Sequence, residues 1–364
     1  MLDTQKSIPA RQIALFSACV LPVYKMLELP SLLARRTNGD LWLPALLQLV
    51  LQFALLYAVL CAVKKGDGTL LSRMQNKLGK GLYALYGVYA VFYLFYAVLP
   101  ILDLEKFTYA VFYDTAPTSF SFGFFFLLLA FVGCKRLKTV GRFGDGALFI
   151  FPVAFFALMV MAFSACDLSS LLPLAKTPVQ DVISAVRYTA MPFCDVALLL
   201  PLVLQLDYKK GDGKKITIGY GVGAICSLLF LLVFYGVFAT SAGREHYAFA
   251  KIAQYFPALA VVGRVDLLFV YLLCIIAFFY ACVPFLYTVR CVKRLAPKSS
   301  PCLLSGILAV GAFVFTLFCN KYYDAIYSLF GYQLYPVFWV FGFILPLFLL
   351  FFTGGKKRAT NAST

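Results

Sequence analysis

The chain has 364 residues, of which 62% are hydrophobic and 13% are charged, and its mean hydropathy is +0.87. Soluble domains carry about 25% charged residues, so this composition excludes a soluble globular protein and indicates an integral membrane protein. The formal net charge of +16 comes from 32 Lys and Arg residues against 16 Asp and Glu residues. These basic residues are dispersed along the chain, which is typical of loops facing anionic lipid and predicts no contact with nucleic acid.

Eight stretches without charged residues reach the roughly 20 residues that a membrane-spanning helix requires. They are Leu41–Val63, Leu82–Leu102, Thr115–Cys134, Ala147–Cys166, Ile216–Gly243, Leu267–Val289, Ser299–Asn320 and Ala325–Gly355. Two further windows of similar length contain charge: Gln12–Ala34 holds Lys25 and Glu28, and Tyr188–Leu206 holds Asp195. We therefore expect an all-α membrane protein with ten transmembrane helices in one polytopic domain, residues 1–353, followed by a short basic tail, residues 354–364.

The distribution of Lys and Arg predicts the orientation of these spans, because short cytoplasmic loops accumulate basic residues. A cytoplasmic amino terminus places 22 of them on the cytoplasmic side and 9 on the outer side, with Lys25 inside the membrane. The sequence therefore predicts that both termini are cytoplasmic. The first apolar segment is too long for the core of a signal peptide and lacks a small-residue cleavage site, so we expect it to be retained.

Chemistry-bearing motifs are scarce. Most of the 11 cysteines lie within predicted spans and form no CxxC pair, so we expect neither a disulfide framework nor a metal site. The single histidine, His246, falls in an outer loop, and no serine has a GxSxG setting. We expect no enzymatic activity and no cofactor.

Two glycine-rich motifs have structural interpretations. The pentapeptide KKGDG occurs at Lys64–Gly68 and Lys209–Gly213, where it is typical of a tight cytoplasmic turn. The stretch GYGVGA contains Gly219, Gly221 and Gly223 inside an apolar span with no following Lys-Ser or Lys-Thr. This setting favours close helix packing over phosphate binding.

The charges inside the spans are the strongest functional signal. A charged side chain at bilayer depth costs at least roughly 2.5–3.5 kcal/mol on insertion scales, so it usually faces an interior cavity and has a partner. Lys25 and Glu28 are three residues apart and share a helix face. Either this pair neutralises itself and only fixes packing, or Lys25 shares its charge between Glu28 and Asp195 beside a polar cavity.

Prolines accompany these charges in the same two spans. Pro22 and Pro192 each remove a backbone donor and should open the first and sixth helices, leaving free polar groups that need protein or a water-filled cavity around them. If the ten spans form two halves, residues 12–166 and 184–353, these are the first helices of each half. Matched interruptions of this kind indicate an inverted-repeat transporter fold with a site at the membrane midplane.

Six segments, in this order, resemble the spore germination permeases, which are the B subunits of endospore germinant receptors within the amino acid-polyamine-organocation superfamily. They are "SIPARQIALFSACVLPV", "NGDLWLPALL", "GRFGDGALFIFPVAFFALMV", "DLSSLLPL", "MPFCDVALLLPLV" and "VVGRVDLLFVYLLCIIAFF". The similarity runs over residues 7 to 353. It implies a LeuT-like 5+5 inverted repeat with discontinuous helices 1 and 6, and a germinant-sensing role beside A-type and C-type subunits in the inner membrane of the endospore.

The resemblance also implies where a small ligand such as an amino acid would bind, between the broken regions Val20–Val23 and Thr189–Asp195. Its carboxylate would be held by freed N–H groups and its ammonium by carbonyls or Asp195. In the third span, Tyr89, Tyr93 and Tyr96 share one helical face and either wall this pocket or serve as packing residues. The candidate ligand-binding residues are Val20, Leu21, Pro22, Val23, Lys25, Glu28, Tyr89, Tyr93, Tyr96, Thr189, Pro192, Phe193, Cys194, Asp195 and Tyr280.

Three functions are compatible with this sequence. The first is a germinant-sensing receptor subunit, in which ligand binding biases a conformational equilibrium that partner subunits read. The second is an autonomous amino-acid symporter coupled to protons or sodium, with Asp195 or Glu28 as the coupling carboxylate. The third is a structural membrane subunit with a vestigial pocket.

Overall fold

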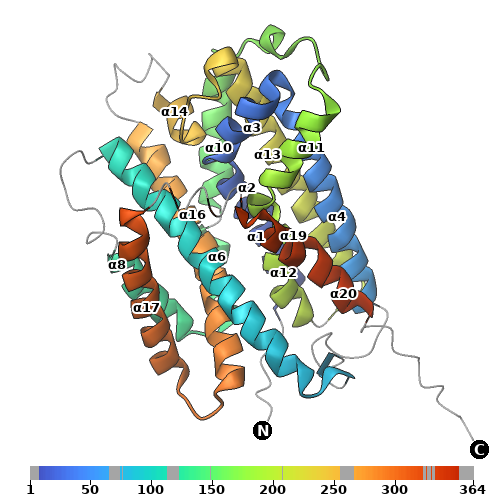
Figure 1. Ribbon diagram of the computed structural model, residues 1–364, viewed down its shortest axis with the longest axis vertical. Coiled ribbons are helices and arrows are strands. Elements are labelled where there is room, and N and C mark those ends of the chain that lie inside the picture. The colour runs from blue at the N-terminus through green and yellow to red at the C-terminus, as the bar shows by residue number, and fades with distance from the viewer. Residues whose placement is uncertain are drawn as a thin grey trace, which may run out of the picture.

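The computed structural model describes residues 8–64, 74–75, 77–112, 123–147, 149–206, 208–254, 266–322, 325, 329 and 333–351. Regular structure in these ranges is helical throughout (Figure 1). The first seven residues, residues 115–122 of the fourth predicted span, most of residues 323–332 in the tenth, most of the first KKGDG copy and the predicted tail 354–364 lie outside the described residues.

The first half of the chain contains the helices α1 to α10 with two 3₁₀ turns. They are α1 (Ala10–Cys19), α2 (Leu21–Lys25), α3 (Leu29–Thr37), η1 (Asn38–Leu41), α4 (Trp42–Lys64), α6 (Gly81–Phe112), α8 (Gly123–Gly133), α9 (Leu137–Ala147), α10 (Ile150–Phe163) and η2 (Leu168–Leu171). The second half contains α11 (Val179–Tyr188), η3 (Met191–Phe193), α12 (Asp195–Leu204), α13 (Asp212–Phe238), η4 (Ala239–Ser241), α14 (Ala248–Gln254), α16 (Asp266–Leu295), α17 (Pro301–Lys321), α19 (Tyr335–Trp339), the π-helical turn η6 (Val340–Ile344) and α20 (Leu345–Phe351).

Five helical segments among the described residues are long and apolar enough to cross a membrane, or six if one bent pair counts as a span. The five are Leu29–Lys64, Gly81–Lys106, Asp212–Ser241, Cys274–Leu295 and Pro301–Cys319, and the bent pair is Val179–Tyr188 with Met191–Leu204. Shorter apolar helices, Gly123–Gly133, Ile150–Phe163 and Tyr335–Leu350, fall within the fourth, fifth and tenth predicted windows. The apolar segments of the described chain are therefore helical, as expected for an integral membrane protein.

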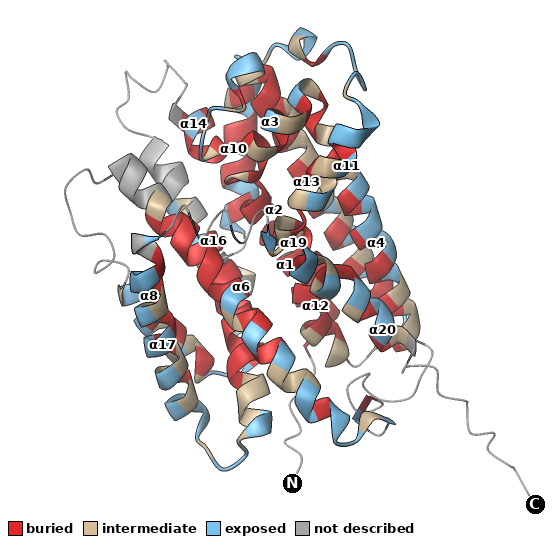
Figure 2. Cartoon of the chain, viewed as in Figure 1, coloured by how far each residue is buried: buried red, intermediate tan, exposed pale blue. Residues whose placement is uncertain are grey.

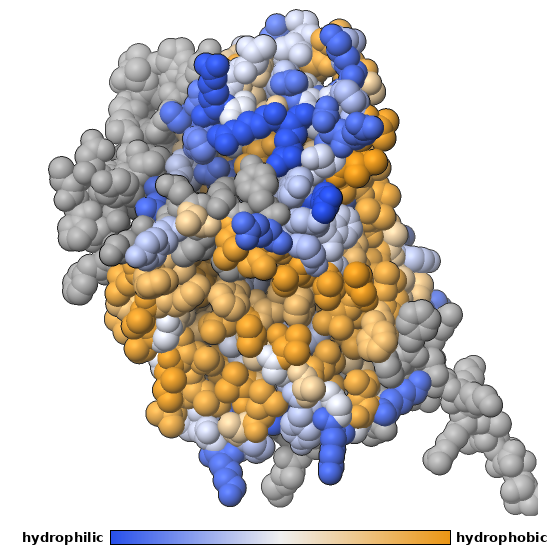
Figure 3. Space-filling model, in the orientation of Figure 1, coloured by the Kyte–Doolittle hydropathy of each residue, from blue (hydrophilic) through white to orange (hydrophobic). Residues whose placement is uncertain are grey.

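The surface carries the apolar band expected of a protein surrounded by lipid. Figure 3 shows hydrophobic side chains across the middle of one face, with hydrophilic residues gathered towards the two ends. Large apolar side chains stand exposed on α8 and α10, including Leu127, Val153 and Phe156, which are 68%, 72% and 71% exposed. So much apolar surface would be unfavourable in water, but hydrocarbon can cover it.

The helices pack in pairs that join the two halves of the chain. Helix α6 runs along α16 and α8 packs against α17, while α13 packs against both α1 and α4 (Figure 1). The short helix α12 lies among these elements and is almost entirely buried (Figure 2). Elements from the first and sixth predicted spans thereby meet in the interior.

Glycines permit the close approach of α1 and α13. A Cβ atom on Gly219 would lie 2.4 Å from the carbonyl oxygen of Ala14, and one on Gly223 would lie 2.4 Å from that of Ser17. Gly221 has nothing within 4 Å of the same hypothetical atom. The prediction that this motif serves helix packing is therefore confirmed for Gly219 and Gly223, which are four residues apart on one face.

This difference gives a prediction with an internal control. Gly219→Ala should lower the melting temperature of the purified protein, because the added methyl group collides with backbone atoms of α1 that cannot move independently. Gly221→Ala should leave the melting temperature unchanged or raise it, because alanine is favoured over glycine within a helix by about 1 kcal/mol. Equal effects of the two substitutions would contradict the proposed contact.

Candidate functional site

The first predicted span is interrupted in two places. Helix α1 ends at Cys19, and α2 begins at Leu21 with Pro22 in its first turn, where the missing proline N–H removes no helical hydrogen bond. Helix α2 ends at Lys25, and the turn Met26–Glu28 separates it from α3. The predicted break near Pro22 is therefore confirmed, with a second break after Lys25.

The sixth predicted span is broken more sharply. The segments Val179–Tyr188 and Met191–Leu204 meet at an angle of 75°. Thr189 and Cys194 have non-helical backbone angles on either side of the short turn η3, which contains Pro192. The predicted break near Pro192 is confirmed.

The two breaks lie beside each other and are joined by a buried ion pair. Lys25 Nζ lies 2.6 Å from Asp195 Oδ1, and the two side chains are 2% and 1% exposed. Lys25 Nζ also donates to the Leu21 carbonyl at 3.3 Å and lies 5.4 Å from the ring centroid of Phe193. Tyr220 donates to the second carboxylate oxygen of Asp195 at 2.8 Å. Both charges are therefore hydrogen-bonded as well as paired, which is the condition under which buried charge is tolerated.

The predicted contact of Lys25 with Asp195 is confirmed. The predicted contact of Lys25 with Glu28 is wrong, both as a shared charge and as a self-neutralising pair. Glu28 Oε2 instead lies 3.4 Å from His246 Nδ1, in the segment before α14. The spacing of three residues brings two side chains together only along a continuous helix. Because α2 ends at Lys25, the turn Met26–Glu28 directs Glu28 elsewhere.

Tyrosines of the third and eighth predicted spans surround the breaks. Tyr96 donates to the Met191 carbonyl at 3.0 Å and shares a hydrogen bond of 2.8 Å with the Tyr280 hydroxyl. Tyr93 donates to the Ala197 carbonyl in the first turn of α12 at 2.8 Å. Tyr89 stacks on Tyr93, with ring centroids 5.4 Å apart, and does not reach the breaks through any hydrogen bond among the described residues. Two of the three predicted tyrosines of the third span thus contact the broken sixth helix.

The remaining predicted residues are buried around the ion pair. Val20, Leu21, Pro22 and Val23 all lie in the core, as do Phe193 and Cys194. Cys194 Sγ donates to the Phe338 carbonyl at 3.4 Å. Pro22 packs beside Gly223, since a Cβ on that glycine would lie 3.2 Å from Pro22 Cγ. The structure thus brings together almost the whole predicted set, with Glu28 turned away and Tyr89 at a distance.

Sequence reasoning missed two glutamines that form hydrogen bonds at the sixth-span break. Gln52 accepts from the Val196 N–H at 2.9 Å and donates to the Gly342 carbonyl at 3.2 Å. Gln48 donates to Thr189 Oγ1 at 2.8 Å. The sequence did contain a sign of their role. Gln48 and Gln52 are amide side chains four residues apart in the uncharged run Leu41–Val63, so they lie on one helix face. One of the N–H groups expected to hold a ligand carboxylate is therefore already bonded internally.

A second missed group links α2 to the third predicted span. Tyr24, adjacent to Lys25, donates to Asp103 Oδ2 at 2.8 Å and stacks on Tyr280 with ring centroids 5.2 Å apart. Asp103 follows the uncharged run Leu82–Leu102, but α6 continues beyond it without a break. Asp103 therefore lies within a helix and beside Tyr24, whereas the sequence placed it just outside the third span.

The pairing gives a prediction that separates Asp195 from Glu28. Lys25→Met should destabilise the protein by about 3–5 kcal/mol, because it strands the carboxylate of Asp195 in the interior. Adding Asp195→Asn should recover most of that loss, whereas adding Glu28→Gln should recover none. Thermal unfolding of the purified variants measures both effects. Rescue by Glu28→Gln alone would show that Lys25 is paired with Glu28 instead.

Comparison with known proteins places the chain in a family. No group of three or more His, Cys, Asp or Glu residues that could hold a metal ion occurs in the described ranges. No curated protein matches the chain. A family model described as spore germination protein, the spore permease family, matches residues 13–324, which include both broken helices and the surrounding tyrosines. The chain belongs to the spore germination protein family.

Proposed function

We propose that this protein is the germinant-sensing membrane subunit of a spore germination receptor. The observation that carries the proposal is the ion pair between Lys25 and Asp195, buried where two broken helices meet in a member of the spore germination family. Charges buried this deeply in a membrane protein usually mark a ligand or ion path. The germinant is a small molecule such as an amino acid, bound between α2 and α12.

The ion pair resembles the ligand that we propose. Lys25 and Asp195 present one ammonium and one carboxylate, the same two groups that an amino acid carries. An amino acid entering between them can pair its carboxylate with Lys25 and its ammonium with Asp195, so that each buried charge keeps a partner. The exchange separates the two side chains, and with them α2 and α12, and this change is what partner subunits of A type and C type would read.

Helix pairing supports a LeuT-like arrangement of ten spans as two inverted repeats, consistent with the amino acid-polyamine-organocation superfamily. Such a repeat makes span n equivalent to span n+5. The packing of α6 on α16 and α8 on α17 joins the third span to the eighth and the fourth to the ninth, and α13 of the seventh span packs on α4 of the second as well as on α1 of the first. The ion pair joins the first span to the sixth. We infer that residues 1–353 form this single domain in the inner membrane of the endospore.

An autonomous symporter is the second candidate, because Asp195 is a buried carboxylate that a coupling ion could neutralise. Uptake of radiolabelled amino acids by proteoliposomes containing this subunit alone would favour it over the receptor. We infer a binding function rather than catalysis in either case, since the groups gathered at the breaks are an internally paired acid and base with tyrosine hydroxyls.

The orientation of the protein is a prediction of the same proposal. The basic segment Lys209–Lys215, which runs into the first turn of α13, lies at the end of the molecule where α12 finishes, opposite the start of α11 (Figure 1). A cysteine replacing Lys210 should therefore be protected from a membrane-impermeant maleimide in intact cells, and one replacing Lys176 should be labelled. The parent protein, with its native cysteines, provides the background signal. Labelling at position 210 with protection at position 176 would reverse the topology.

The function is tested with spores that lack this gene. Wild-type protein should restore germination on one or more members of a panel of amino acids, whereas the double variant K25M/D195N should reach the same level in the spore membrane and fail to restore it. K176Q/D181N is a control matched in charge, because it removes one lysine and one aspartate from exposed positions. Full germination of spores carrying K25M/D195N would show that the ion pair serves only packing, which would contradict the proposal.

A further inference from the structure

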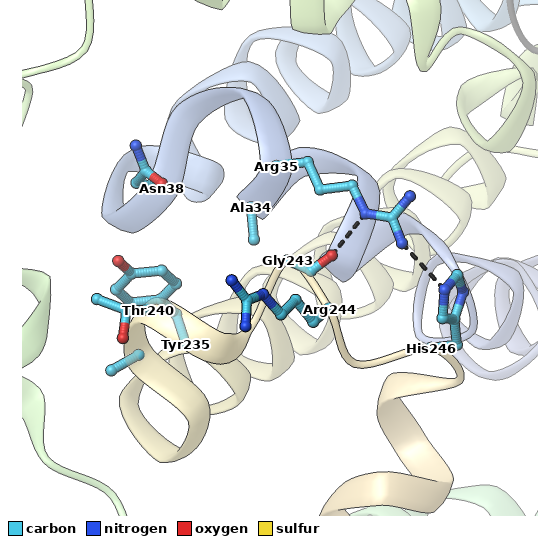
Figure 4. Close-up of a pocket in the computed structure, with 9 residues that line it drawn as sticks. Ala34, Arg35, Asn38, Tyr235, Thr240, Gly243, Arg244 and His246 are labelled. Atoms are coloured by element: carbon cyan, nitrogen blue, oxygen red, sulfur yellow. Dashed lines mark hydrogen bonds between the residues drawn. The ribbon is translucent and has the colours of Figure 1, made fainter.

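A cavity lies between α3, the end of α13 with η4, and the segment before α14 (Figure 4). Its volume is about 500 Å³. The polar side chains that line it are Arg35, Asn38, Tyr235, Thr240, Arg244 and His246. This end of the molecule also carries hydrophilic surface (Figure 3), and the charge distribution predicts that it faces outwards.

The lining is positively charged and contains no acidic residue. Arg35 is held in place, because its Nε donates to the Gly243 carbonyl at 2.5 Å and its Nη2 lies 3.0 Å from His246 Nε2. Arg244 is different: its guanidinium has no hydrogen bond or ion pair within the described part of the chain. Figure 4 shows it directed away from His246, towards the side of the cavity where Asn38 and Tyr235 lie.

The nearby carboxylates are engaged elsewhere. Glu28 lies against His246, and Glu245 lies 3.6 Å from Lys251. Asp40 accepts hydrogen bonds from the Ala175 and Thr177 N–H groups at 2.7 and 2.8 Å, and from the Thr177 hydroxyl at 2.8 Å. None of these acids lines the cavity, so the exposed guanidinium of Arg244 faces an opening whose lining carries no negative charge.

The backbone of the cavity wall is strained at two positions. Asn38 and Ala239 have φ angles of 47° and 44°, in a region that residues with a side chain rarely adopt. Both residues line the cavity. Strained backbone concentrates at ligand-binding sites, where the surrounding structure holds it in place.

We propose that this cavity binds an oxyanion, the carboxylate or phosphate group of a ligand, with Arg244 as its charged partner. Asn38, Thr240 and Tyr235 supply neutral donors from the opposite wall, and Arg35 adds positive charge at the rim. The site is distinct from the buried Lys25–Asp195 pair and goes beyond the sensing role, because it stands whether or not an amino acid binds between the broken helices.

The cavity is connected to the turn that follows Lys25. A guanidinium can only donate, so His246 Nε2 accepts from Arg35 and the Nδ1–H of His246 faces Glu28 Oε2 at 3.4 Å. Glu28 closes the turn Met26–Glu28, one residue before α3 begins. An anion that draws Arg35 away from His246 would therefore also change the contact between His246 and Glu28.

The single histidine makes the test specific. Because His246 is the only histidine in the chain, histidine-selective ¹³C labelling of full-length protein purified without a histidine tag gives one imidazole signal, located at the cavity. In nanodiscs of zwitterionic lipid at constant ionic strength, inorganic phosphate or acetate should shift this signal saturably. R244Q should weaken the apparent affinity about tenfold or more, since it removes a charged donor. K176Q, which removes one exposed positive charge from the same end, should not change it.

Nanodiscs that contain an anionic phospholipid distinguish a lipid headgroup from a soluble ligand. If lipid is the source, the signal should already be shifted in these discs in the wild type but not in R244Q, and phosphate should add nothing. R35Q should move the signal without any anion, which confirms that the imidazole reports on the cavity. The proposal is overturned if neither phosphate, acetate nor anionic lipid shifts the signal, or if R244Q responds as the wild type does.

Discussion

The structure depends on a single electrostatic constraint, which is that Lys25 and Asp195 must stay together. Either charge alone would be stranded in the buried interior, where its cost is several kcal/mol. Each therefore fixes the position of the other, and with it the end of α2 and the start of α12. Tyr220 and the Leu21 carbonyl complete the hydrogen bonding of the pair. The broken helices are held in register by this pair rather than by apolar packing alone.

Breaking two helices inside a membrane protein also leaves backbone groups without helical partners, and these need replacements from the rest of the fold. Side chains from other helices supply them. Gln52 caps the Val196 N–H, and Tyr93 and Tyr96 donate to carbonyls on either side of Asp195. Most polar groups at the breaks are therefore bonded within the protein, with Gln48 Oε1 a buried exception among the described residues. The proposed ligand would have to exchange with these existing bonds. That requirement would link binding to movement, as the proposed sensing role needs.

The sequence by itself determined the features that arise from local chemistry. Long uncharged runs can be stable only as helices in lipid, so the membrane class follows from composition. Proline alone does not decide where a helix breaks, since α6 and α16 contain Pro100 and Pro284 without an interruption. The interruptions near Pro22 and Pro192 were predictable because these prolines share their spans with buried charges. The same holds for close packing at Gly219 and Gly223, since a small residue every fourth position creates a flat helix face whatever its partner.

Only the tertiary structure decided which groups meet. The predicted contact of Glu28 with Lys25 assumed a continuous helix. The three-residue turn after Lys25 places Glu28 beside His246 instead. Tyr220 reaches Asp195 from the following helix, α13, and Gln52 reaches Val196 from α4 in the other half of the chain. No local pattern specifies either contact. The cavity around Arg244 likewise needs three separate segments to enclose it. A periodic pattern fixes the face on which a side chain lies, but its partner depends on how the helices are packed together.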